Sequence, residues 1–148
     1  MSYLLRLPRQ ARSNLAVLRR AELPGVSLVQ VIHVASEGSL DEACRFAELG
    51  IDALLLDSGD QRLPVKLLGG TGRTHDWSIS RRIRDAVNVL IFLAGGLRPD
   101  NVARAISEVQ PFGVDVCSSL RTNGILDELK LMQFLREVNR SVSAMGSS

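Results

Sequence analysis

Carboxylate, glycine and hydroxyl residues stand at the ends of three apolar runs in this sequence. Asp57 ends the run "DALLLD", Gly95 and Gly96 end "VLIFLAGG", and Ser118 and Ser119 end "GVDVCSS". A carboxyl group can act as a general acid, and glycines followed by a helix N-terminus bring backbone N–H groups close to a bound anion. The three stretches are therefore candidates for a phosphate site with a carboxyl group beside it.

A fourth stretch, "GGTGRTHDW", places glycines directly before a predicted helix. The loop residues that could hold a phosphate are Gly69, Gly70, Thr71 and Gly72. The alternative is that these glycines, like Gly95 and Gly96, only permit tight turns between strand and helix. Two such loops after neighbouring strands, with a serine pair after the next, favour the phosphate site.

Asp57, His33 and Cys117 each allow a chemical and a structural interpretation. Asp57 is a candidate general acid, but an aspartate at the end of an apolar strand can also serve as a cap or an ion-pair partner. His33 ends the run "LVQVIHV" one strand earlier and could line the same cavity, or be a core histidine with satisfied hydrogen bonds. Cys117 could point into the cavity or pack as a small buried side chain.

Apolar runs rich in Val, Ile and Leu alternate with amphipathic segments along the chain. The predicted strands cover residues 28–34, 52–57, 89–96 and 113–119. The predicted helices cover residues 39–50, 76–87, 98–111 and 126–139. Ser39 followed by Glu42 predicts a capping box for the first helix. Near-continuous apolar strands that alternate with helices predict a parallel sheet with helical crossovers, in which ligands bind at the carboxyl ends of the strands.

The chain is predicted to form one domain, residues 1–148, with a parallel α/β fold of βα repeats. Within residues 1–27, "YLLRL" could add one strand followed by a crossover helix. Residues 28–139 hold the four clear βα units, and the small polar residues 140–148 predict a flexible tail. A closed (β/α)₈ barrel typically needs about 250 residues, so the pattern corresponds to roughly half a TIM barrel.

Composition excludes several classes of function. The 18 basic and 16 acidic residues give a net charge of +2, too balanced to predict a nucleic-acid or membrane surface. No apolar stretch approaches the roughly 18 residues of a membrane span. Two cysteines make neither a disulfide framework nor a zinc site, and no metal is expected. The expected compartment is the cytoplasm.

Four linked motifs resemble the second half of phosphoribosylanthranilate isomerase, a barrel enzyme of tryptophan biosynthesis. They are "DALLLDS", "GGTGRTHDW", "FLAGGLRPDNVARAI" and "PFGVDVCSS". The resemblance implies that the four clear strands are the fifth to eighth of the barrel, with "YLLRL" a remnant of the fourth. It further implies that Asp57 is the general acid, that the glycine loops and the serine loop hold the substrate phosphate, and that no cofactor is needed.

The implied reaction is an Amadori rearrangement of N-(5′-phosphoribosyl)anthranilate by general acid–base catalysis. In the family, the first strand supplies a cysteine base in a Lys-Ile-Cys-Gly type motif, and this sequence has no such motif. Loss of a general base typically costs about 10² to 10⁴ in rate, so impaired activity is expected. Cys117 is a candidate replacement, because the eighth strand neighbours the first in a closed barrel. The run after Ser119 also differs from the family pattern.

Two hypotheses from different classes follow. In the first, the chain is an isomerase whose half-barrel is completed by a second copy or by a complementary N-terminal half, which would cover its open strand edges and apolar inner face. In the second, it is a catalytically silent phosphosugar-binding or scaffold module that folds on its own as an open, flavodoxin-like sheet. Turnover of the phosphosugar separates the two hypotheses.

Overall fold

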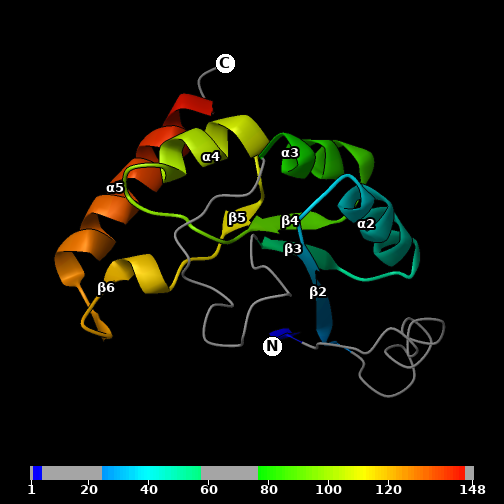
Figure 1. Ribbon diagram of the computed structural model, residues 1–148, viewed down its shortest axis with the longest axis horizontal. Helices are drawn as coiled ribbons and strands as arrows, with labels where there is room; N and C mark the ends of the chain where they lie inside the picture. The colour runs from blue at the N-terminus through cyan, green and yellow to red at the C-terminus, as the bar shows by residue number, and fades with distance from the viewer. Residues whose placement is uncertain (1, 5–24, 58–76, 146–148) are drawn as a thin grey trace.

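The computed structural model describes residues 2–4, 25–57 and 77–145 (Figure 1). Five parallel strands form one sheet in the order β1-β2-β3-β4-β5. Their bounds are Ser2–Leu4, Ser27–His33, Ala53–Asp57, Leu90–Leu93 and Gly113–Val114. The predicted parallel βα repeat is therefore confirmed. β1 includes the first two residues of "YLLRL", Tyr3 and Leu4, and the rest of that run lies outside the described residues.

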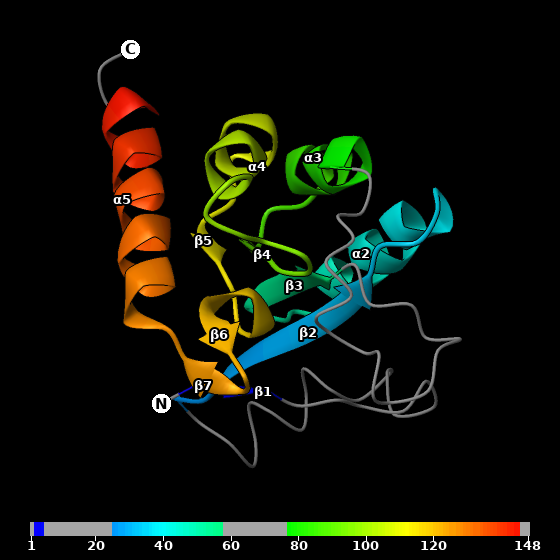
Figure 2. The same ribbon diagram turned by 60° about the vertical axis from the view of Figure 1, so that its left-hand side comes forward.

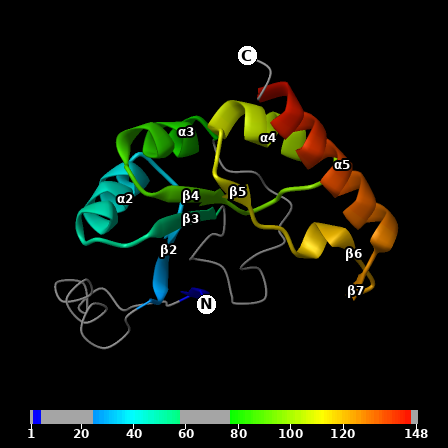
Figure 3. The same cartoon turned by 180° about the vertical axis from the view of Figure 1, so that it is seen from behind.

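Three helices cover one face of the sheet, as Figures 1 and 3 show from opposite sides. They are α2 (Gly38–Glu48), α3 (Trp77–Ala86) and α4 (Val102–Val109). The core lies between these helices and the sheet, where Ile32, Leu54 and Leu93 are almost fully buried. β2 and β4 alternate buried and part-exposed residues throughout, and β3 does so from Leu54 onward, because successive side chains point to opposite faces and helices cover only one of them in the described part of the chain.

The opposite face of the sheet carries a second, smaller apolar layer. The ring of Phe92 on β4 meets the ring of Phe112 edge-on, with 5.5 Å between centroids. An added Cβ at Gly113 would approach the Phe92 ring to 2.9 Å, so the ring occupies the space that a side chain on β5 would need. Leu90, at the start of β4, is 45% exposed on this inner face.

Helix α5 (Glu128–Met145) packs beside α4, as Figure 2 shows, and closes the described chain. Residues 140–145 were expected in a flexible tail but lie in this helix. The hydroxyls of Ser141 and Ser143 donate to the carbonyls of Glu137 and Asn139, one turn earlier, so these small polar side chains bond to the helix itself.

The predicted strand 113–119 is the largest departure from expectation. β5 ends at Val114, and the chain then forms the 3₁₀ turn η3 (Ser118–Leu120). A short hairpin follows, in which β6 (Arg121–Thr122) pairs with β7 (Ile125–Leu126). Asn123 and Gly124 both have positive φ, 52° and 80°, as a two-residue type I′ turn requires.

The predicted capping box at Ser39 is wrong. Ser39 lies inside α2, and its hydroxyl donates to the carbonyl of His33 at 3.2 Å and accepts from the N–H of Ala35 at 3.3 Å. It therefore ties the end of β2 to the first turn of α2. Gly50, with φ 76°, follows the end of this helix as predicted. Among the described residues, no helix is both long and apolar enough to cross a membrane.

Candidate active site

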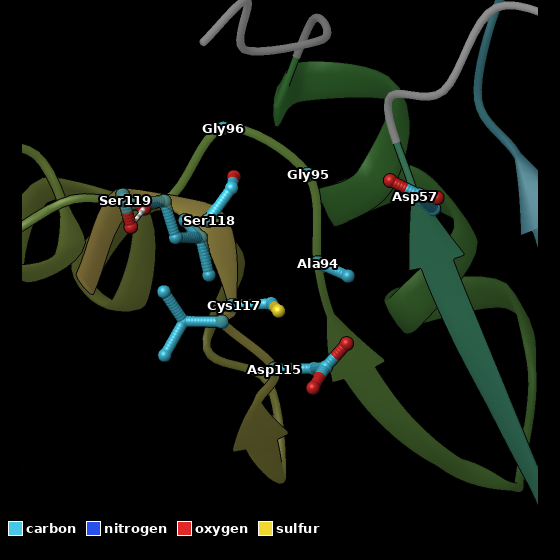
Figure 4. A pocket seen from close by; sticks show the side chains of 10 residues that line it. Asp57, Ala94, Gly95, Gly96, Asp115, Cys117, Ser118 and Ser119 are labelled. Atoms are coloured by element: carbon cyan, nitrogen blue, oxygen red, sulfur yellow. Dashed lines mark hydrogen bonds between the residues drawn. The ribbon is translucent and has the colours of Figure 1, made fainter. Parts of the chain in front are cut away.

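A cavity of about 260 Å³ lies at the carboxyl ends of β3, β4 and β5 (Figure 4). This is the end of a parallel sheet where ligands bind. The cavity is lined by Asp57, Ala94, Gly95, Gly96, Leu97, Asp115, Val116, Cys117, Ser118 and Ser119. The cavity thus brings together residues that the sequence singled out separately: Asp57, Gly95, Gly96, Cys117, Ser118 and Ser119.

Asp57 is the last residue of β3, and its side chain is 22% exposed. It pairs in register with His33, the last residue of β2, and His33 Nδ1 lies 4.0 Å from Asp57 Oδ2. The backbone holds the pair in place, because the carbonyl of Asp57 accepts from the N–H of Val34 at 2.9 Å. His33 does not line the cavity. It lies on the neighbouring strand beside Asp57, with a side chain that is 9% exposed.

Gly95 and Gly96 form a turn directly after β4. Their φ values are 84° and 66°, a region that favours glycine at both positions. The N–H of Ala94 donates to the carbonyl of Leu56 at 2.7 Å, so sheet bonding continues up to the turn. The backbone of the turn therefore reaches the cavity wall with no side chain between it and a ligand.

Ser118 and Ser119 belong to η3 rather than to a strand. The Ser119 hydroxyl donates to the carbonyl of Leu97 at 2.5 Å, which joins η3 to the glycine turn. The Ser118 hydroxyl makes no hydrogen bond within the described residues, and its side chain is exposed. Cys117 also lines the cavity as an exposed thiol.

Asp115 is a cavity residue that the sequence analysis did not single out. Its N–H donates to the carbonyl of Leu93 at 2.8 Å, which extends the β4–β5 ladder one residue past Val114. Figure 4 shows its carboxylate and that of Asp57 at the ends of different strands, with Ala94 of the middle strand between them. The signal was present in "GVDVC", where a carboxylate follows the start of an apolar run, the same pattern that singled out Asp57.

The first glycine loop of the predicted phosphate site is not among the described residues. The loop residues Gly69, Gly70, Thr71 and Gly72 lie outside the described residues. Within the part of the chain that the structure describes, no three His, Cys, Asp or Glu side chains are grouped closely enough to hold a metal ion.

The fold is a parallel βα repeat with a cavity at the carboxyl ends of the strands, the end at which (βα)₈-barrel enzymes bind their ligands. Residues 13–137 match the family model described as N-(5'phosphoribosyl)anthranilate (PRA) isomerase. This chain belongs to that family.

Individual relatives agree with the family model. The chain is 44% identical over 110 residues to an N-(5'-phosphoribosyl)anthranilate isomerase of Methanothrix thermoacetophila, covering 74% of this chain and 50% of the relative. A crystal structure of the Thermotoga maritima isomerase superposes with TM-score 0.67 at 27% identity, covering 93% of this chain and 60% of that one. A structure of monomers of the dimeric Thermotoga maritima enzyme gives TM-score 0.65 at 22% identity, covering 93% and 70%. The chain spans about half the length of the curated relatives it matches.

Proposed function

We propose that this chain carries the acid and phosphate-binding side of an N-(5'-phosphoribosyl)anthranilate isomerase site, for a step of tryptophan biosynthesis. The supporting observation is the cavity that gathers Asp57 at the end of β3, the Gly95–Gly96 turn after β4 and Ser118 in η3 after β5. A carboxyl group at one side and open backbone with a hydroxyl at the other fit a small sugar that bears a phosphate at its far end.

The proposed reaction is an Amadori rearrangement in which Asp57 supplies the first proton. Protonation of the ribose ring oxygen breaks its bond to C1′, and the anthranilate nitrogen becomes part of a Schiff base. A base then removes the C2′ proton, which gives an enolamine that tautomerises to the ketose. Side chains deliver and remove the protons, and the substrate is isomerised without an outside oxidant or reductant, so the proposal includes no metal or organic cofactor.

The base and the completion of the barrel are the open parts of this proposal. Among the described residues that line the cavity, Cys117 and Asp115 are the acidic groups, besides Asp57, that can serve as a base when deprotonated. Completion would come from a second copy of the chain or from a complementary N-terminal half-barrel. Support comes from the apolar side chains that α5 leaves exposed, among them Leu129 at 73% and Met132 at 50%, and from β1 and β5, which end the strand order. Both described cysteines are free thiols, in keeping with the cytoplasm as the proposed compartment.

Turnover of N-(5'-phosphoribosyl)anthranilate by the purified chain tests this proposal, beside an Asp57→Asn variant and with the oligomeric state measured in the same samples by sedimentation. Turnover that the variant loses would support Asp57 as the acid. A titration with ribose 5-phosphate separates the alternatives. Binding without turnover in either protein would favour a silent phosphosugar-binding module, and neither binding nor turnover would overturn the proposed site.

A further inference from the structure

The glycine turn after β4 needs something besides glycine to hold its shape. Glycine permits the positive φ values of Gly95 and Gly96, but it is also the residue with the greatest backbone freedom. A binding site built from backbone N–H groups depends on those groups being fixed before the ligand arrives, because ordering them on binding weakens affinity.

The Asn101 side chain bonds to the backbone on both sides of Leu97. Its Nδ2 donates to the carbonyl of Gly96 at 2.9 Å, and its Oδ1 accepts from the N–H of Arg98 at 2.8 Å. Asn101 directly precedes α4, where an asparagine side chain usually accepts from a helix N–H, but here it makes no such bond. Its amide is used for the turn instead of the helix.

Ser119 holds the same turn from the neighbouring loop. Its hydroxyl donates to the carbonyl of Leu97, so the Leu97–Arg98 peptide is bonded at both ends: its C=O to Ser119 and its N–H to Asn101. Because peptides are planar and trans here, bonding the Gly96 carbonyl to Asn101 also fixes the Leu97 N–H, which points the opposite way. Two side chains therefore set the direction of two consecutive peptide groups at the cavity wall.

We propose that Asn101 and Ser119 are positioning residues that preorganise the Gly95–Leu97 turn for a phosphate, and that Ser118, not Ser119, is the serine whose hydroxyl contacts it. A serine hydroxyl has one proton to donate, and that of Ser119 is committed to Leu97. The Ser118 proton is not committed to any group within the described residues. The inference rests on the proposed phosphate site and revises the sequence-based assignment of Ser119 as a direct ligand.

Amide hydrogen exchange of the unliganded full chain tests the positioning role without any ligand. The Arg98 amide is the reporter, with amides of β2 and β3 as internal references for the overall fold. Asn101→Ala is expected to speed Arg98 exchange about tenfold, and Ser119→Ala about threefold, because each removes one hydrogen bond from the turn. Ser118→Ala is the matched control and should leave this rate unchanged. Asn101→Asp keeps the acceptor for Arg98 but loses the donor to Gly96, so it should fall between parent and alanine variant.

A calorimetric titration with inorganic phosphate tests whether the positioned turn binds phosphate. Asn101→Ala and Ser119→Ala should each raise the Kd about three- to tenfold, with Ser119→Thr restoring it, whereas Ser118→Ala should raise the Kd without changing exchange. Unchanged Arg98 exchange in both Asn101→Ala and Ser119→Ala would overturn the positioning role. A weaker Kd in Ser119→Ala with unchanged exchange would instead make Ser119 a direct ligand. A parent chain that binds no phosphate would overturn the proposed site itself, and the exchange data would still decide whether these residues hold the turn.

Discussion

Asp52 and Asp57 stand at opposite ends of β3, and the structure uses them differently. The Asp52 carboxylate accepts from the N–H of Leu28 at 2.6 Å, and its backbone bonds to both neighbouring strands through Leu28 and Leu90. Asp57 bonds to the sheet through its backbone carbonyl, and its carboxylate lies at the cavity. The same residue type therefore fastens the sheet at its amino end and lines the candidate site at its carboxyl end. In parallel α/β proteins the end of the strand, more than the residue, decides between these roles.

The largest effect is expected from removing the carboxyl group that is the proposed acid, at the cavity end of β3. Asp57→Asn should lower kcat/KM for N-(5'-phosphoribosyl)anthranilate by about 10² to 10⁴, because the amide cannot protonate the ribose oxygen. Asp52→Asn is the matched control. It keeps an oxygen that can accept from Leu28 and should retain nearly all turnover. Steady-state kinetics of the two variants at equal concentration measures the contrast, and equal losses would break the distinction between the two ends.

The next largest effect is expected at the amino end of β3, where a substitution should lower the free energy of unfolding. Asp52→Ala leaves the Leu28 N–H without its carboxylate acceptor and should lower the free energy of unfolding by about 1.5 to 3 kcal/mol. Urea unfolding of Asp52→Ala and Asp57→Ala, followed by circular dichroism, compares the two ends directly. A larger loss in Asp57→Ala would mean that the cavity carboxylate also fastens the sheet.

A smaller effect is expected where β5 begins, also away from the cavity. Gly113→Ala places a methyl group at 2.9 Å from the Phe92 ring. The ring can turn partly aside, so a loss of about 1 kcal/mol in the free energy of unfolding is expected. Adding Phe92→Leu to Gly113→Ala should cost less than the two changes separately, which a double-mutant cycle measures. Additive costs would show that the two positions do not compete for this space.

The smallest effect concerns acid conditions and the segment that follows the site. The Asp127 carboxylate accepts from the Thr122 hydroxyl at 2.7 Å and from the N–H groups of Leu129 and Lys130 at 3.1 and 3.2 Å. These hydrogen bonds hold the pKa of Asp127 below its ordinary value of 3.8, and the bond from Thr122 has the largest effect. A lowered folded-state pKa means that this stabilisation is present above the unfolded value and is lost as the pH falls through the folded one.

Thr122→Ala should therefore raise the pKa of Asp127 toward 3.8 and reduce the loss of stability that occurs as the pH falls below that value. A carboxyl NMR titration of parent and variant measures the shift. Asp85, whose pKa is lowered by hydrogen bonds from Arg81 and Arg84 on α3, is an internal reference that should titrate identically in both proteins. An unmoved Asp127 midpoint would contradict the assigned cause.

The part of the fold that could be predicted is the part set by local pattern. The apolar runs located β2, β3 and β4 to within a few residues, because strands packed under helices need such runs. The pattern failed after Val114, where "DVCSS" still resembles a strand but turns into η3. The Asn123–Gly124 hairpin could have been found from that dipeptide, which is a strong turn signal.

The candidate site shows the same division. Asp57, Gly95 and Ser118 were found because their types and positions after apolar runs carry chemical meaning. Asn101 bonds to Gly96 only five residues earlier, but an asparagine before a helix equally predicts an ordinary N-cap, so its use for the turn does not follow from the sequence. The contact of Ser119 with Leu97 depends on how two loops meet in space. Such contacts between residues far apart in the chain have no local pattern, so sequence reasoning grouped Ser119 with Ser118.

The parallel order of the sheet also bears on how the chain folds. Val29 pairs with Ala53, and Ala53 with Leu90, each across a long connecting segment. The entropy of closing those loops must be lost before any strand pairing is gained, which slows folding. The β6–β7 hairpin closes through two residues, a process of microseconds. Refolding is therefore expected to show an early local phase at the hairpin, well before the slow assembly of the sheet whose carboxyl ends form the cavity.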